Sequence, residues 1–264
     1  MEKSKQIETI SIIGSGNVAS SLGFVLLEAG IKIKEIYSRT AKNAESLAKK
    51  LDCSWVDNLN VLDPNSDLYL IAISDDQLSH IGDKLGHLNG IVAHTSGSQP
   101  INILKSKKGS SGIFYPLQTM TKSQLPDFTN IPICIEANNS DAAEQLKNLA
   151  DKISTKVVYL NSDQRQYLHL TAVTVNNFTN LLYNHAHDVL MDKEIDFSLL
   201  IPLINETADK IRNTHPKDAQ TGPARRNDKA IINKHLKLLD DYPDYQELYS
   251  LLSNQLIRKY HDKL

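Results

Sequence analysis

The sequence predicts an α/β fold in which a parallel sheet with helices on both faces is followed by a region made of helices alone. Two observations predict it. Up to about residue 160, short apolar runs alternate with segments of helical periodicity, as in parallel strands joined by crossover helices. Beyond residue 160 no strand signal remains. We therefore predict two domains, 1–160 and 161–264, and 264 residues are enough for both.

The individual elements follow from apolar spacing and from turn residues. The first strand ends directly at Gly14, and the helix after it ends at Gly30, a residue type that commonly terminates helices. Strands are predicted at 10–13, 34–38, 67–73, 91–94, 132–135 and 156–160, with helices at 18–29, 41–51, 75–85 and 141–153. The second domain is predicted to contain one long helix at 164–192 and helices at 198–212, 225–240 and 245–262.

The composition excludes several classes of function. A net charge of −2 gives no electrostatic reason to expect nucleic acid or an anionic membrane as partner. The two cysteines, Cys53 and Cys134, have no metal-binding spacing, so we expect reduced thiols and no metal. The segment 1–8 is polar, and no apolar run approaches the roughly 18 residues of a membrane span. We expect a cytoplasmic protein.

A glycine-rich turn carries the strongest functional signal. The segment 14–19 reads GSGNVA, which matches G-x-G-x-x-G/A, and it lies between a predicted strand and a predicted helix. Gly14 would form the tight turn, Gly16 would let the backbone approach a pyrophosphate, and Ala19 would let helix and strand pack closely. The helix N-terminus would then face the phosphates. The turn predicts a Rossmann dinucleotide-binding domain, and the alternative is an ordinary strand-to-helix turn.

The end of the second strand favours NADP over NAD. NAD-binding domains usually carry an acidic residue there, which binds the ribose 2′-OH, whereas this chain has Ser38, Arg39 and Thr40. A guanidinium and two hydroxyls suit a 2′-phosphate, although a solvated arginine is the alternative. The predicted cofactor-binding residues are Gly14, Ser15, Gly16, Asn17, Val18, Ser38, Arg39, Thr40 and Ser74.

Ligands of open α/β sheets lie beyond the carboxyl ends of the strands, and two of those ends are polar here. Ser74 and the adjacent acids 75–76 follow one strand, although the acids alone would also suit the start of a helix. His94 ends another strand, where it is either a proton donor or a hydrogen-bonded structural histidine.

The long helix at 164–192 carries a polar face of amides and imidazoles. At 100° per residue, His169, Asn176, Asn180 and His187 fall within about 40° of one another. Such a face suits a cleft or an interface, and a solvated face is the alternative. The predicted catalytic residues are His94, His169 and Asn176.

A second unusual segment precedes the helix at 225–240. Gly222 and Pro223 break the chain there, and Arg226 and Asp228 follow. These two charged residues contact either cofactor or substrate, or they belong to an ordinary helix-entry loop.

Four segments together resemble a known family. They are GSGNVA at 14–19, HTSG at 94–97, YPLQT at 115–119, and TGP at 221–223 followed by Arg226 and Asp228. The chain resembles Rossmann-like proteins with a C-terminal DUF2520 domain, related to F420-dependent NADP reductases and pyrroline-5-carboxylate reductases. The resemblance covers nearly the whole chain. It implies NADP as cofactor and an all-α C-terminal domain like that of 6-phosphogluconate dehydrogenase.

The chain departs from that family at two positions. Tyr115 replaces a common histidine, which puts a histidine-based role there in doubt, and Asn227 replaces a common glycine. Asparagine is the best substitute if that position is left-handed. The related β-hydroxyacid dehydrogenases use Lys-x-x-x-Asn on the long helix, but no lysine occurs between Asp163 and Asp192, and His169 occupies the corresponding region. These residues argue against that chemistry.

The sequence leaves two classes of function open. The first is an NADPH-dependent reductase of a small carbonyl or imine, with His94 or His169 as proton donor. The second is a non-catalytic NADP-binding sensor or regulatory protein. The residues also leave F420 open as a redox partner.

We further expect a homodimer through the helical domain. A helix at 164–192 is roughly 43 Å long, and a second copy would cover the apolar side that one domain leaves exposed. The resemblance implies the same pairing, and the alternative is a monomer whose helices close on themselves.

Overall fold

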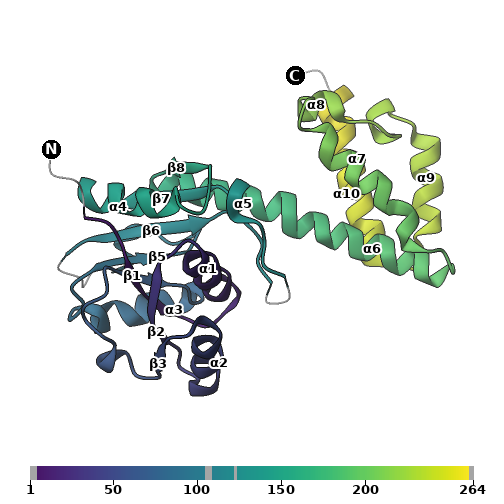
Figure 1. Cartoon of the computed structure of the whole chain (residues 1–264). Helices are drawn as coiled ribbons and strands as arrows, with labels where there is room; N and C mark the ends of the chain where they lie inside the picture. The colour runs from purple at the N-terminus through teal and green to yellow at the C-terminus, as the bar shows by residue number, and fades with distance from the viewer. Residues whose placement is uncertain (1–4, 105–108, 122–123, 262–264) are drawn as a thin grey trace. The chain divides into compact units, whose positions relative to one another are not determined.

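The computed structural model describes residues 5–104, 109–121 and 124–261. By their contacts these residues form two compact units, which divide between Asn176 and Asn177 (Figure 1). The first unit contains the sheet and the helix α5 (Ser162–Val173), whereas the sequence pattern groups that helix with the helical region. We describe each unit by itself.

The first unit is built on a single eight-stranded sheet with the order β3-β2-β1-β4-β5-β6-β7-β8. Its first six strands have the order 3-2-1-4-5-6 of the Rossmann fold. The strands are β1 (Thr9–Ile13), β2 (Lys32–Tyr37), β3 (Ser54–Val56), β4 (Leu68–Ile71), β5 (Ile91–His94), β6 (Ser111–Pro116), β7 (Ile133–Ala137) and β8 (Val157–Tyr159). The predicted α/β class is confirmed.

One strand pair departs from the predicted parallel arrangement. β6 and β7 are antiparallel, with Phe114 opposite Ile135, while every other neighbouring pair of named strands is parallel. The reversal follows from the connection between β6 and β7, whose described residues form the short 3-10 helix η4 (Phe128–Asn130) and no crossover helix. The chain therefore returns along the neighbouring strand in the opposite direction.

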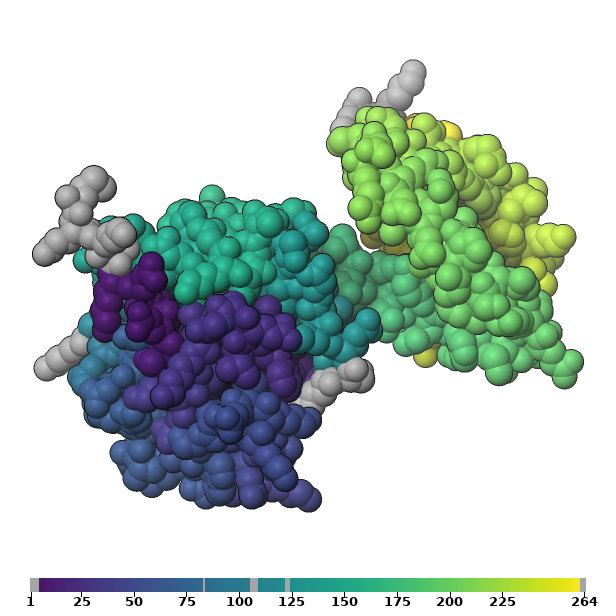
Figure 2. All heavy atoms as spheres, viewed as in Figure 1, coloured from purple at the N-terminus to yellow at the C-terminus, as the bar shows by residue number. Residues whose placement is uncertain are grey.

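Helices cover both faces of this sheet (Figure 1). Successive residues of β4 show why, since Leu68 and Leu70 join one buried cluster and Tyr69 and Ile71 join the other. On the first face lie α1 (Asn17–Glu28), α2 (Ala41–Leu51) and α4 (Ser140–Ala150), and on the second lie α3 (Asp75–Ile81), η1 (Leu59–Val61), η2 (Gly82–Leu85) and η3 (Ile101–Leu104). In the space-filling view the atoms of the first unit, coloured purple to teal, form one closely packed body (Figure 2).

The helical segment from Ser162 to Asp192 is continuous but not uniform. α5 leads into a π-helical turn, η5 (Thr174–Phe178), and then into α6 (Thr179–Asp192). A π turn holds more residues per turn than an α-helix, so the 100° spacing assumed for the predicted polar face does not hold across η5. The side chain of Leu168 on α5 packs against the buried cluster of β6 and β7.

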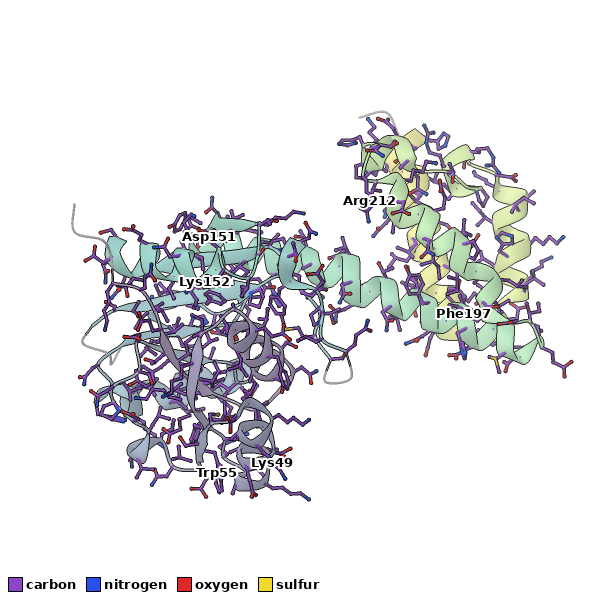
Figure 3. The ribbon with its side chains drawn as sticks, viewed as in Figure 1. Lys49, Trp55, Asp151, Lys152, Phe197 and Arg212 are labelled. Carbon is purple, nitrogen blue, oxygen red and sulfur yellow. The ribbon has the colours of Figure 1, made fainter. Side chains whose placement is uncertain are left out.

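The second unit is entirely helical in its described residues. Besides α6 it contains η6 (Phe197–Leu200), α7 (Ile201–Lys210), α8 (Pro216–Ala219), η7 (Ala224–Arg226), α9 (Lys229–Leu238) and α10 (Pro243–His261). Figure 3 labels the side chains of Phe197, in η6, and of Arg212, which follows α7. In the first unit it labels Lys49 of α2 and Trp55 of β3. Among the residues that the structure describes, no helix is long and apolar enough to cross a membrane.

Candidate active site

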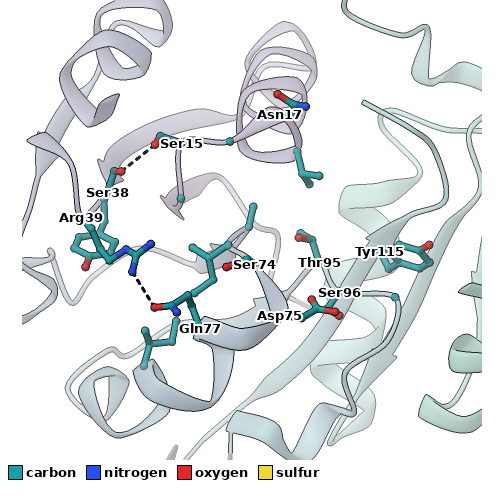
Figure 4. A pocket seen from close by; sticks show the side chains of 18 of the residues that line it. Ser15, Asn17, Ser38, Arg39, Ser74, Asp75, Gln77, Thr95, Ser96 and Tyr115 are labelled. Carbon is teal, nitrogen blue, oxygen red and sulfur yellow. Dashed lines mark hydrogen bonds between the residues drawn. The ribbon is translucent and has the colours of Figure 1, made fainter. Parts of the chain in front are cut away.

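A pocket of about 600 Å³ opens beyond the carboxyl ends of β1, β2, β4 and β5 (Figure 4). It lies within the first unit. Its lining includes all nine residues that the sequence predicts to bind the cofactor: Gly14, Ser15, Gly16, Asn17, Val18, Ser38, Arg39, Thr40 and Ser74. Their contact with a cofactor stays a prediction.

The two glycines of the turn have different physical roles. Gly14 has a φ of 131°, and a Cβ there would lie 2.1 Å from the carbonyl oxygen of Ala72, so the fold itself requires glycine. Gly16 has no positive φ, and a Cβ there would have no atom within 4 Å. Gly14 thus lets β1 lie against β4, whereas Gly16 keeps an open space above the backbone.

The N-terminus of α1 suits an anion. Gly16 is its N-cap and provides no side-chain hydrogen bond, and the first turn carries no acidic residue. The first N–H groups of a helix lack partners within it, and the helix dipole favours negative charge there. The open space above Gly16 and these N–H groups therefore fit the pyrophosphate of a dinucleotide.

Arg39 lies at the end of the pocket formed by β2 and α3. Its Nη1 donates a hydrogen bond of 3.0 Å to Oε1 of Gln77, while the Ser15 hydroxyl donates to Ser38 Oγ at 2.9 Å (Figure 4). Arg39 is exposed, and within the described residues no carboxylate forms an ion pair with it. The guanidinium therefore offers a positive charge to this end of the pocket, with the Asp76 carboxylate near enough to interact with it electrostatically but not paired with it.

His94 is fully buried and is absent from the pocket lining. Its Nδ1 accepts from the backbone N–H of Ser96 at 3.2 Å, and its Nε2 lies 3.4 Å from the Pro100 carbonyl oxygen. Burial, followed by the nearby charge of Arg165, lowers the pKa of His94 to about 4. This geometry favours the structural alternative that the sequence left open for His94.

The low pKa of His94 predicts a loss of stability in acid. Since the unfolded histidine binds a proton near pH 6.5 and the folded one near pH 4, the unfolded chain binds more protons between these values. The free energy of unfolding should therefore fall as the pH falls through this window, by about 2 kcal/mol from pH 7 to pH 5.

Urea unfolding of wild type and His94→Asn at the two pH values measures this effect. Asparagine keeps an acceptor for the Ser96 N–H, and the variant should lose about 2 kcal/mol less than wild type on acidification. His80→Asn, at an exposed histidine of α3, is the control and should behave as wild type. An identical pH dependence in wild type and His94→Asn would contradict the prediction.

The loop after β5 carries hydroxyls that line the pocket. Ser96 Oγ accepts from the backbone N–H groups of Ser98 and Gln99, and Ser98 Oγ donates to Oδ2 of Asp75 on α3. Asp75, in the first turn of α3, therefore also anchors this loop by accepting the hydrogen bond from Ser98. The hydrogen bonds fix the backbone of Gly97 at the pocket wall.

His169 also lines the pocket, and it does so together with Tyr115. The Tyr115 hydroxyl lies 3.0 Å from Nδ1 of His169. Tyr115 is the position where the sequence departs from the family's usual histidine, and sequence reasoning did not include it among the site residues. The signal that pointed to it was the YPLQT segment, which the structure places at the end of β6.

Other predicted residues lie elsewhere. Asn176, in η5, is exposed and is absent from the pocket lining. In the second unit Asn227 has φ 55° and ψ 38°, the left-handed conformation expected there. Asp228 accepts from the Ile231 N–H and caps α9, which favours the helix-entry alternative, and Arg226 is exposed.

A buried ion pair outside the pocket lining supports the loop after β5, which forms part of the pocket wall. Arg165 is fully buried; it donates from Nη1 to Oε2 of Glu136 on β7 and from Nη2 to the backbone oxygen of Gln99. The Ser162 hydroxyl donates to the same carboxylate at 2.9 Å and accepts from the Ile101 N–H at 3.1 Å. This network connects α5 to β7 and to the loop that follows β5. Sequence reasoning did not predict it.

The fold and the pocket define a class of protein, and comparison with known families agrees. Residues 9–92 match the family described as NADP oxidoreductase coenzyme F420-dependent. Residues 131–256 match a domain of unknown function, DUF2520. With the Rossmann strand order and the glycine turn, these matches identify a Rossmann-type NADP oxidoreductase.

A solved structure places the chain more narrowly. A candidate NADP oxidoreductase from Bacteroides fragilis is 37% identical over 96% of this chain and 98% of its own, with a TM-score of 0.90. The chain therefore belongs to the NADP oxidoreductases that carry a C-terminal DUF2520 domain, and the resemblance found in the sequence is confirmed. Among curated proteins no relative was found.

Two more distant structures share the fold. An imine reductase from Myxococcus stipitatus in complex with NADP+ has a TM-score of 0.67 at 15% identity, over 95% of this chain and 93% of its own. A 1-pyrroline-5-carboxylate reductase from Streptococcus pyogenes has a TM-score of 0.65 at 14% identity, over 97% and 98%. At these identities the likeness concerns the fold alone.

Proposed function

We propose that this protein is an NADPH-dependent reductase of a small carbonyl or imine. One observation carries the proposal. The same pocket joins the glycine turn and Arg39 at one end to a titratable side chain, His169, at the other. A single cavity can thus hold a dinucleotide and a proton donor, which reduction of a C=O or C=N bond needs.

The residues present fit NADPH. Gly14, Gly16 and the N-terminus of α1 would hold the pyrophosphate, and Arg39 with Ser38 and Thr40 would bind the 2′-phosphate. Bound NADPH supplies a hydride from its nicotinamide ring. Thr95, Ser96 and Gly97, from the loop after β5, would form the wall at the reacting end. The fold neighbour crystallised with NADP+ supports this choice of cofactor.

His169 is the proton donor in this proposal. It lines the pocket, whereas His94 is buried and both of its ring nitrogens face backbone groups. Addition of hydride to a carbonyl or imine carbon leaves an electron pair on oxygen or nitrogen, and that atom must gain a proton. A donor in the same pocket meets this requirement without relying on bulk water.

The cofactor part of the proposal predicts a preference that depends on Arg39. NADPH should bind more tightly than NADH in a fluorescence titration. Arg39→Ala should weaken NADPH binding by about 30-fold, or roughly 2 kcal/mol, because it removes a charged hydrogen bond to the 2′-phosphate. NADH binding should change little.

Lys49→Ala is the matched control, since it removes a positive charge from the opposite end of α2. It should leave both affinities unchanged. Equal binding of NADPH and NADH by the wild type would contradict the proposed cofactor. For the reaction, oxidation of NADPH is followed at 340 nm with a panel of small ketones, aldehydes and cyclic imines, and no turnover of any of them would refute the proposed reductase.

We also propose a homodimer through the helical unit. Large apolar side chains of that unit are exposed, among them Leu199 at 70%, Leu203 at 62% and Leu238 at 65% of their surface. Apolar surface on this scale is typical of an interface, and a two-fold contact between identical chains is the commonest solution.

Light scattering at low micromolar concentration tests the dimer. The expected mass is twice the chain's 29.5 kDa. Leu203→Glu should shift the mass toward that of one chain, because it places a charge in the apolar surface of α7. A wild type at 29.5 kDa would exclude a stable dimer.

A further inference from the structure

Three elements of the first unit converge at one corner of the pocket. Tyr115 comes from the end of β6, His169 from α5, and Gly97 from the loop after β5. The Tyr115 and His169 rings meet edge to face, with centroids 6.0 Å apart and planes at 71°. The hydroxyl lies 3.0 Å from Nδ1, within hydrogen-bonding distance.

Gly97 provides the space for this contact. A Cβ at that position would lie 2.6 Å from Nδ1 of His169 and 2.7 Å from Cζ of Tyr115. Both distances are far below van der Waals contact, so any side chain at 97 would displace the pair. The contact between the two rings therefore depends on the absence of a side chain at position 97.

The surroundings of Tyr115 keep its hydroxyl neutral. The groups that act on it are Cys134 of β7, Arg165 of α5 and Asp75 of α3. Burial is the main cause that raises the pKa of Tyr115 to about 12. A neutral hydroxyl can both donate and accept a hydrogen bond, whereas a tyrosinate could only accept.

We propose that Tyr115 is a positioning residue: it binds Nδ1 of His169, sets the resting neutral ring in the Nε2–H form, and leaves Nε2 as the nitrogen that protonates the reduced substrate. The proposal rests on the proposed reductase function. Because Nδ1 is engaged by Tyr115, Nε2 is the ring nitrogen left for a ligand in the pocket. Neither Tyr115 nor this division of roles was apparent from the sequence.

The hydrogen bond works in both protonation states of the ring. In the neutral ring the Tyr115 hydroxyl donates to Nδ1, so the ring proton resides on Nε2. In the imidazolium the Nδ1–H donates to the Tyr115 oxygen instead, and Nε2 again carries a proton. The ring keeps its orientation, and only the hydroxyl hydrogen turns.

The proton transfer balances. When the substrate carbon accepts hydride, the electron pair of its double bond moves to the oxygen or nitrogen, which takes the Nε2 proton of the imidazolium. The ring leaves the step in the neutral Nδ1–H form, a transient form whose Nδ1–H donates to the Tyr115 oxygen and which differs from the resting Nε2–H form. A proton from solvent then restores the imidazolium for the next turnover.

The test reads the position of the ring proton directly. Two-bond ¹H–¹⁵N correlation spectra of the full chain, labelled at histidine, distinguish a protonated from an unprotonated ring nitrogen. In the wild type we expect neutral His169 in the Nε2–H form, and in Tyr115→Phe a mixture of both forms. A wild-type Nδ1–H form, or a Tyr115→Phe spectrum like the wild type, would overturn the proposal.

The chain contains its own matched control. In the second unit the Tyr249 hydroxyl lies 2.7 Å from Nδ1 of His235, with rings 5.7 Å apart at 76°, nearly the same arrangement. Tyr249→Phe should change the His235 signals and leave those of His169 as in the wild type. A change at His169 in this variant would show that the readout is not specific to Tyr115.

A second variant and a second measurement complete the design. Gly97→Ala should give the same mixed His169 signals by steric displacement, and it replaces Tyr115→Phe if that variant fails to fold. With a substrate in hand, Tyr115→Phe should lower kcat about tenfold, part of the 10²–10⁴ expected of a general acid, without changing NADPH affinity. If the wild type did not bind NADPH, the proposed function would be refuted, but the spectra would still report where the His169 ring proton lies.

Discussion

Replacing Glu136 by alanine is expected to destabilise the first unit by about 3–5 kcal/mol, because it leaves a buried guanidinium without its counter-ion. Arg165 is fully buried, and its other described hydrogen-bond acceptors are the Gln99 backbone oxygen and the Ser162 hydroxyl. The Ser162 hydroxyl would also lose its acceptor. Urea unfolding monitored by circular dichroism measures the change in the free energy of unfolding.

The chain offers a control in Asp151→Ala. Asp151 pairs with Lys147 on the exposed side of α4, and such pairs contribute about 0.5 kcal/mol or less. Adding Arg165→Met to Glu136→Ala should recover part of the lost stability, since the uncompensated charge disappears. A Glu136→Ala variant as stable as the wild type would show that the ion pair does not hold α5 against the sheet.

Gly16→Val is expected to weaken NADPH binding by at least ~100-fold, or about 2.7 kcal/mol, with little change in stability. The valine side chain would extend into the open space above the turn, where a Cβ has no neighbour within 4 Å. The loss would therefore arise from exclusion of the pyrophosphate and not from strain in the fold. Fluorescence titration and thermal unfolding, run on the same sample, separate the two effects.

Two other glycines serve as controls for this variant. Gly86 also has open space at its Cβ position but lies outside the pocket lining, so Gly86→Val should retain affinity. Gly14→Ala should lose stability as well as affinity, because its Cβ would overlap the Ala72 carbonyl oxygen. Wild-type affinity in Gly16→Val would contradict the placement of the cofactor on this turn.

Local patterns in the sequence predicted much of the fold. The apolar runs of β1, β4 and β5 and the glycine that ends β1 are visible within a few residues of one another. Two strands were missed. β3 has three residues and is mostly exposed, and β6 ends in Tyr115 and Pro116, which suit a loop as well as a strand end. Their place in the sheet depends on pairing with distant strands.

The same contrast between local motifs and long-range contacts applies to the residues of the candidate site. All nine predicted cofactor residues line the pocket because each belongs to a short motif at the end of a strand. Tyr115 and His169 are 54 positions apart, and Glu136 and Arg165 are 29 apart, so only the folded chain shows that they meet. For His94 the sequence left two roles open, because a strand-end histidine suits catalysis or structure equally well until its burial is known.

The order of the pocket's parts along the chain has a consequence for biosynthesis. The glycine turn at residue 14 leaves the ribosome early, but its partner Ala72 follows 58 residues later and His169 another 97 residues after that. Since the chain emerges from its N-terminus, the cavity cannot close until α5 has been made. A nascent chain stalled before α5 should therefore bind the cofactor poorly, and the nucleotide should act late, on an almost complete polypeptide, rather than as a template for its early folding.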